Sequence, residues 1–146
     1  PVKLFIVSSG SDEERLEALA VREGLADDVI FAGSVDRDAL MRYIRASDIF
    51  ILNTTYEGFS HLLIETMAVG TPVVTTNVGG NPEAIDDNVS GFLVQPNDIT
   101  ALESRVARLL NEPQVYDRIR RAALERAATF SDERMLTETE KLLRTL

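Results

Sequence analysis

The chain has 146 residues, 45% of them hydrophobic and 27% charged, which is enough for one ordinary globular domain and short for two. The 24 acidic and 15 basic residues give a formal net charge of −9, which argues against nucleic acid or an anionic membrane as the main partner. The chain has no cysteine and one histidine, which excludes disulfides and thiolate metal sites and argues against any site for a transition metal. No apolar run approaches the roughly 20 residues of a spanning helix, and no signal peptide is visible, so we expect a soluble, cytoplasmic domain.

Short apolar runs alternate with longer amphipathic segments along the first hundred residues. Strands are predicted at residues 2–7, 29–33, 48–52, 72–76 and 91–94. The first helix is expected to begin after Ser11 and to end at Gly24, and Asp36 is expected to cap the second helix. A third helix follows Ser60 and ends at Gly70, and a short helical turn follows the fourth strand.

This alternation predicts an α/β fold, a Rossmann-like doubly wound parallel sheet with helices on both faces. From Asp98 onward the pattern is purely helical, so residues 98–146 are predicted to form a helical tail, and residues 1–146 are treated as a single domain. Such sheets bind ligands beyond the carboxyl ends of their strands. Three loops lie there: "SSGSDE", "AGSVDRD" and "NTTYEGFSH".

The stretch "NTTYEGFSHLLIE" combines features of a nucleotide site. Gly58 lets the backbone approach a ligand closely, and Ser60 as N-cap would leave the amides of residues 61–63 pointing outward as an anion site. Glu65 lies roughly 7.5 Å further along the helix axis, where its carboxylate could accept two hydrogen bonds from a vicinal diol. Glu57, before the helix, would lie further along the ligand, past the phosphates.

Simpler interpretations of these acids remain open. Glu65 could pair with His61, which shares its helix face, and Glu57 could be a solvated loop acid. Residues 46–104 contain no lysine or arginine. A phosphate site there could use only amides and hydroxyls, whereas diphosphate binding usually recruits a basic side chain. Either the ligand is not a diphosphate, or the basic group comes from elsewhere.

Structural interpretations are favoured for the remaining motifs. "SSGSDEER" has one glycine where a dinucleotide fingerprint needs three, so a turn with an N-cap is preferred to a phosphate loop. The Asp-x-Asp pattern at residues 36–38 opens a helix, which favours a cap over a metal site. "VGGNPE" is interpreted as a tight loop with Glu83 starting a helical turn. The six arginines between Arg105 and Arg126 are interleaved with acids, as on a solvated face or an interdomain surface.

With these residues laid out, the chain resembles the C-terminal domain of the group 1 retaining glycosyltransferases, which have two Rossmann-like domains in the GT-B arrangement. The resemblance rests on two glutamates spaced eight apart, the following "MAVGTPVV", and then "GGNPE" and "GFLV" in that order. It covers nearly the whole chain. Each motif alone would be weak, and together they are specific.

The resemblance implies a donor site for a nucleotide-diphosphate sugar. Glu65 matches the glutamate that holds the ribose hydroxyls, and Glu57 matches the catalytic glutamate against the donor sugar. The segment whose backbone contacts the sugar and phosphates corresponds to Gly58, Phe59, Ser60, His61 and Leu62, and the loop beside the base corresponds to Gly33, Ser34 and Val35. The implied reaction is hexosyl transfer with retained configuration and with no metal or other cofactor, the leaving diphosphate being stabilised by positive charge and the helix dipole.

The chain also departs from the family pattern. The family has an upstream strand and helix with a Gly-Arg and a lysine that neutralise the diphosphate. We expect these to be missing here, together with the N-terminal acceptor-binding domain. "ILN" replaces a commoner Pro-Ser ending of the third strand, and His61 stands at a variable position, where its amide is the favoured contact. The chain alone is therefore expected to bind a nucleotide sugar weakly and to be inactive.

Partners and rival functions follow from the same residues. We expect a nucleotide sugar as ligand, no nucleic acid and no transmembrane segment, with peripheral membrane contact of the full-length protein left open. One alternative is a catalytically inactive Rossmann-like interaction module, which the absent basic pair and the arginine-rich helices would fit. The other is part of a sugar-nucleotide epimerase, which shares the two-domain fold.

Overall fold

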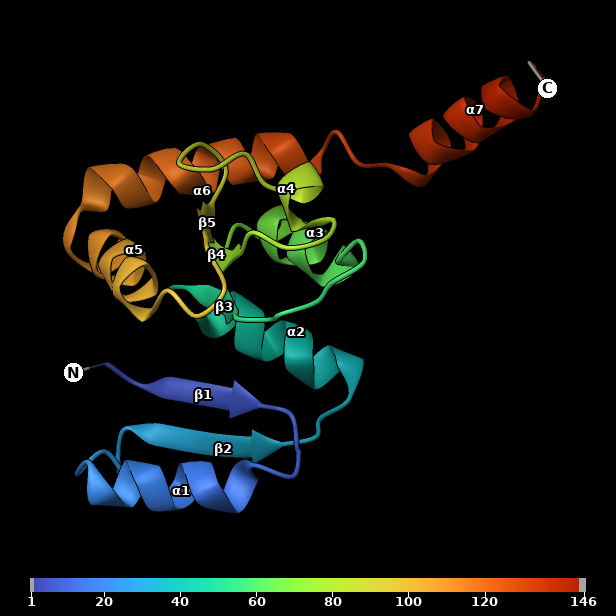
Figure 1. Cartoon of the computed structure of the whole chain (residues 1–146). Coiled ribbons are helices and arrows are strands. Elements are labelled where there is room, and N and C mark those ends of the chain that lie inside the picture. The colour runs from blue at the N-terminus through green and yellow to red at the C-terminus, as the bar shows by residue number, and fades with distance from the viewer. Residues whose placement is uncertain (1, 145–146) are drawn as a thin grey trace. The chain divides into compact units, whose positions relative to one another are not determined.

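The computed structural model describes residues 2–144, and the side chains of all of these except 132–134 and 138. The chain divides into two compact units, Pro1–Tyr43 and Ile44–Leu146, and each is described by itself (Figure 1). The prediction of a single domain over residues 1–146 stays a prediction.

The first unit is a strand–helix–strand arrangement followed by the start of a second helix. Its elements are β1 (Leu4–Val7), α1 (Glu13–Arg22), β2 (Val29–Gly33) and α2 (Arg37–Ala46), the last running into the second unit. The two strands are parallel, with Leu4 opposite Val29 and a register shift between Ile6 and Val7. The parallel pairing follows from the helix that connects them.

Helix ends in this unit follow the local signals in the sequence, with one correction. Gly24 has a φ of +72°, the left-handed conformation that ends α1, and the Asp36 carboxylate accepts a 2.7 Å hydrogen bond from the Ala39 amide. The predicted cap Ser11 is wrong, because the residue before α1 is Asp12. Its carboxylate makes no cap bond and instead lies 2.6 Å from Arg15.

The second unit holds a three-stranded parallel sheet in the order β3-β4-β5. Val73 lies opposite Phe50 on one side, and Val74 lies opposite Phe92 on the other. The elements in chain order are β3 (Phe50–Leu52), α3 (His61–Ala68), β4 (Val73–Thr76), α4 (Asn81–Ala84), β5 (Phe92–Val94), α5 (Ile99–Asn111), α6 (Pro113–Ala127) and α7 (Asp132–Leu143).

Adjacent residues of β4 face two different hydrophobic clusters, as expected where side chains alternate across a sheet. Val73 packs with residues of α3, α4 and α6, including Leu63 and Met67. Val74 packs with Phe92 and with residues of α5 and α6, including Ile119. All four β4 residues are buried. The sheet therefore has helices on both faces, and the predicted Rossmann-like α/β class is confirmed.

The predicted helical tail contains α5, α6 and α7, and α6 packs against both α3 and α5 (Figure 1). The last two residues of the predicted tail, 145 and 146, lie outside the described residues. Within residues 2–144, none of the helices combines the length and the apolar character needed to span a bilayer.

Candidate functional site

The loop that leaves β3 is tied to the end of β4 by threonine hydroxyls. The Thr76 hydroxyl donates to the Thr54 carbonyl at 2.6 Å and accepts from the Thr54 amide at 3.2 Å. The Thr54 hydroxyl donates in turn to the Tyr56 carbonyl at 2.7 Å. These bonds fix the segment just before Glu57 at the carboxyl edge of the sheet, where parallel α/β folds bind ligands.

The glycine pair of "VGGNPE" lies directly against the next part of this loop. The Gly80 amide donates a 2.6 Å hydrogen bond to the Gly58 carbonyl. A Cβ atom on Gly79 would collide with the Glu57 carbonyl, and one on Gly80 would collide with the Gly58 carbonyl. The sequence suggested a structural loop, and the structure shows that the glycines also permit close contact with the segment carrying Glu57.

The short helix α4 is held at its start by a buried asparagine. The Asn81 amide nitrogen donates to the Thr75 hydroxyl at 3.1 Å and to the Thr76 carbonyl at 3.0 Å. The end of β4 therefore anchors the loop after β3 through Thr76 and the loop after β4 through Asn81. The two loops are fixed by the same strand.

The N-terminus of α3 lacks a side-chain cap. Ser60 occupies the N-cap position, as predicted, but its hydroxyl accepts no hydrogen bond from the helix amides although the residue is only 7% exposed. The first amides of a helix have no partner within the helix, so this end can receive an acceptor from outside. His61, the first helical residue, is exposed.

The two glutamates lie on either side of this helix end. Glu57 is half-buried in the preceding loop, and its carboxylate has no hydrogen-bond or ion-pair partner in residues 2–144. Glu65 is half-buried on α3, beyond the first turn. Between them, the Phe59 ring meets the His61 ring edge-on, with centroids 5.7 Å apart and an interplanar angle of 82°. Leu62 is half-buried beside His61.

The predicted base loop belongs to the first unit. Gly33 has a φ of +64°, the Ser34 hydroxyl lies 2.7 Å from the Ser9 hydroxyl, and Val35 is half-buried. Ser9 was missed by sequence reasoning, although it lies in the loop after β1 as Ser34 lies in the loop after β2. The structure brings Glu57, residues 58–62 and Glu65 together in the second unit. Residues 33–35 belong to the first unit. Their roles stay predictions.

Several arginines of α5 and α6 contact other groups of the second unit. On a purely solvated face, one of the two predicted interpretations, they would contact only water. Arg120 donates to the Gly70 carbonyl at the C-terminal end of α3, and Arg118 donates to the Asn88 carbonyl. The guanidinium carbons of Arg105 and Arg108 lie 5.0 and 5.5 Å from the Phe92 ring centroid. These arginines support the loops and the core, so they add little to the case for an interaction module.

No group of three or more histidine, aspartate or glutamate residues within the described part of the chain is arranged to hold a metal ion. Asp36 of the Asp-x-Asp pattern instead caps α2, as the preferred interpretation predicted.

Comparison with known proteins gives a consistent picture. Residues 1–126 match the model of the family "Glycosyl transferases group 1". The chain is 38% identical over 117 residues to D-inositol 3-phosphate glycosyltransferase of Streptomyces griseus, an alignment that covers 80% of this chain and 25% of that protein. The chain thus spans about a quarter of the length of the curated relatives it matches.

Solved structures share the fold. Sucrose-phosphate synthase from Thermosynechococcus elongatus superposes with a TM-score of 0.84 at 30% identity, over 98% of this chain and 38% of that one. Anabaena HepE in complex with UDP superposes with a TM-score of 0.86 at 24% identity, over 99% of this chain and 41% of that one. With the family model matching most of its length, the chain belongs to the group 1 glycosyltransferases.

Proposed function

We propose that this chain is the donor-binding half of a retaining glycosyltransferase, which transfers a hexosyl unit from a nucleotide-diphosphate sugar to an acceptor without a metal. The proposal depends mainly on one observation: Glu57 and Glu65 flank a helix N-terminus that has no side-chain cap. The aligned residues make up about a quarter of the length of the relatives, which supports an acceptor-binding domain elsewhere in the full-length protein. Its place of action would be the cytoplasm.

The three parts of this arrangement suit three parts of the donor. The amides at the start of α3 and the helix dipole favour the diphosphate. Glu65, beyond the first turn, would accept hydrogen bonds from the ribose hydroxyls. Glu57 carries a carboxylate without a partner in residues 2–144, and it would face the donor sugar, where positive charge develops as the glycosidic bond breaks. The role of residues 33–35 beside the base, in the first unit, stays a prediction.

The diphosphate also needs a positive counter-charge. Residues 46–104 contain no lysine or arginine, and Arg120 donates at the opposite end of α3, to Gly70. In this proposal the basic group therefore comes from another part of the full-length protein, and the chain alone binds its donor weakly.

The experiment is an NMR titration of the isotopically labelled chain with UDP and UDP-glucose, chosen because HepE was solved in complex with both. We expect amide shifts at Ser34 and at residues 61–65. Glu65→Gln should weaken binding roughly tenfold or more, because hydrogen bonds to a charged group are worth about 1.5–3 kcal/mol. The matched control is Glu103→Gln, an exposed glutamate on α5, which should leave binding unchanged.

Two results would count against the proposal. The first is a titration with UDP, GDP and ADP that moves no amide at Ser34 or at residues 61–65. The second is equal affinity of the Glu65→Gln and Glu103→Gln chains, which would remove the ribose role of Glu65.

A further inference from the structure

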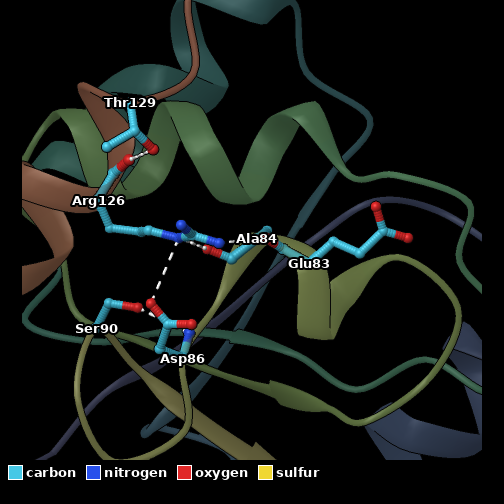
Figure 2. A network of polar contacts seen from close by, with 6 residues as sticks. All are labelled: Glu83, Ala84, Asp86, Ser90, Arg126 and Thr129. Atoms are coloured by element: carbon cyan, nitrogen blue, oxygen red, sulfur yellow. Dashed lines mark hydrogen bonds and ion pairs between the residues drawn. The ribbon is translucent and has the colours of Figure 1, made fainter.

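The C-terminal end of α6 is joined to the end of α4 by one arginine. Figure 2 shows Arg126 reaching the backbone carbonyls of Glu83 and Ala84, with hydrogen bonds of 2.6 and 3.3 Å, while the Glu83 carboxylate points away. The Arg126 guanidinium also lies 3.5 Å from an oxygen of Asp86. The last carbonyls of a helix lack partners within the helix, so this side chain satisfies the end of α4.

The same guanidinium lies over an aromatic ring. The Arg126 guanidinium carbon is 4.9 Å from the centroid of Phe130, which follows α6. The backbone of this turn is fixed, because the Phe130 amide donates to the Ala127 carbonyl and the Thr129 hydroxyl donates to the Arg126 carbonyl (Figure 2). Phe130 is half-buried.

Phe130 in turn contacts the segment between the two glutamates. Its ring centroid lies 5.7 Å from that of Phe59, with an interplanar angle of 49°. Phe59 also meets the His61 ring edge-on. A continuous series of ring contacts therefore runs from Arg126 through Phe130 and Phe59 to the first residue of α3.

A second connection reaches the same segment through the backbone. The helix α4, whose end Arg126 holds, begins next to Gly80, and the Gly80 amide donates to the Gly58 carbonyl. Arg126 thus supports the segment 57–61 by two routes, one aromatic and one through α4. Glu65 lies outside both routes, further along α3.

We propose that Phe130 is a positioning residue for the donor sugar, anchored by Arg126, and this proposal rests on the proposed function. Without the Phe130 ring, Phe59 would lose an aromatic neighbour. It would also lose the ordered position that this contact imposes. Glu57 and His61, on either side of Phe59, would then hold the sugar less well, while the ribose contact of Glu65 would persist. The family model ends at residue 126, so Phe130 lies beyond the region it matches.

The test compares affinities for UDP and UDP-glucose, since only the second carries the sugar. We expect Phe130→Leu to weaken UDP-glucose binding roughly three- to tenfold, the range of an aromatic pair, and to change UDP binding by less than about twofold. Phe130→Tyr keeps the ring and should restore the wild-type ratio of the two affinities. The matched control is Tyr116→Leu, which removes a half-buried aromatic ring from α6 at the other cluster and should leave the ratio unchanged.

A second measurement needs no ligand. In Phe130→Leu and in Arg126→Gln, the ring proton resonances of Phe59 and His61 should shift, and those of Tyr43 should not. If Phe130→Leu fails to fold, two measurements still test the positioning role. One is the Phe59 and His61 ring resonances in Arg126→Gln, and the other is the contact between the Phe59 and Phe130 ring protons in the wild type.

Three outcomes would overturn the positioning role: an unchanged affinity ratio in Phe130→Leu, an equal change in Tyr116→Leu, or unmoved Phe59 and His61 resonances. In each of these the wild-type chain would still bind UDP, so the proposed function would stand. A wild-type chain that bound neither UDP nor UDP-glucose would instead contradict the proposed function, and the positioning role with it.

Discussion

A Cβ atom at Gly58 would meet no other atom within 4 Å, whereas one at Gly80 would collide with the Gly58 carbonyl oxygen. Both residues lie in the same contact between the loops after β3 and β4. Gly58→Ala therefore tests whether a ligand approaches this backbone. Gly80→Ala tests whether the close contact between the loops stabilises the fold.

Gly58→Ala should leave the free energy of unfolding within about 0.5 kcal/mol of wild type, because the added methyl group meets open space. It should still weaken UDP-glucose binding, because the methyl group occupies the surface that the donor approaches. Urea denaturation gives the first quantity and an NMR titration the second. Undiminished affinity in a stable variant would mean that the donor does not approach Gly58.

Gly80→Ala should destabilise the chain by about 1–3 kcal/mol, the usual cost of forcing an extra methyl group into a packed site. The Gly80 φ of −83° suits alanine, so the loss would come from the collision with the Gly58 carbonyl and not from backbone strain. The matched control is Gly10→Ala, where a Cβ meets nothing within 4 Å. Similar unfolding midpoints for the two variants would contradict the close contact.

At the scale of the elements, α3 and α5 begin in different ways. The Asp98 carboxylate accepts a 2.9 Å hydrogen bond from the Ala101 amide, while the Ser60 hydroxyl makes no cap bond. Asp98→Ala should therefore cost about 1 kcal/mol of stability, and Ser60→Ala should cost less. Thermal unfolding of both variants tests this. A larger loss for Ser60→Ala would show that the Ser60 side chain stabilises the chain in another way.

Element boundaries were predictable where the signal is local. Gly24 and Gly70, predicted to end helices, have φ values of +72° and +83°, and Asp36 caps its helix as expected. The start of α1 was misplaced by one residue because Ser11 and Asp12 are both good caps in sequence. Which of them precedes the helix depends on backbone geometry that composition does not reveal.

The candidate site was predictable only in part, for a related reason. Glu57, Ser60 and Glu65 lie within one short stretch, so their spacing placed them around one helix end. Phe130 and Arg126 act on that stretch from far along the chain, and the partners of Arg126 are backbone carbonyls that every residue carries. No residue type marks such a contact in the sequence, which is why the arginines were interpreted as a surface feature.

For the whole molecule, the two units differ in how many of their hydrophobic side chains are buried. In the described part of residues 1–43, Ala20 is the one hydrophobic residue classed as buried, and Leu4 and Phe5 of β1 are 46% and 43% exposed. In residues 44–144, β4 is paired on both sides and fully buried between two clusters. The sequence did not predict this contrast, because β1 is wholly apolar whereas two of the four residues of β4 are threonines.

The contrast predicts two levels of local stability. Amides buried in a core exchange with solvent only through global unfolding, whereas amides of thinly covered elements exchange through smaller openings. Native-state hydrogen exchange should therefore be slowest in β4 and faster in β1 and β2. With added urea, the opening free energy of β4 should fall steeply, because its exchange requires the exposure of a large surface, and that of β1 and β2 should fall less. Equal slopes in all three strands would contradict this and would mean that the chain opens as one cooperative domain.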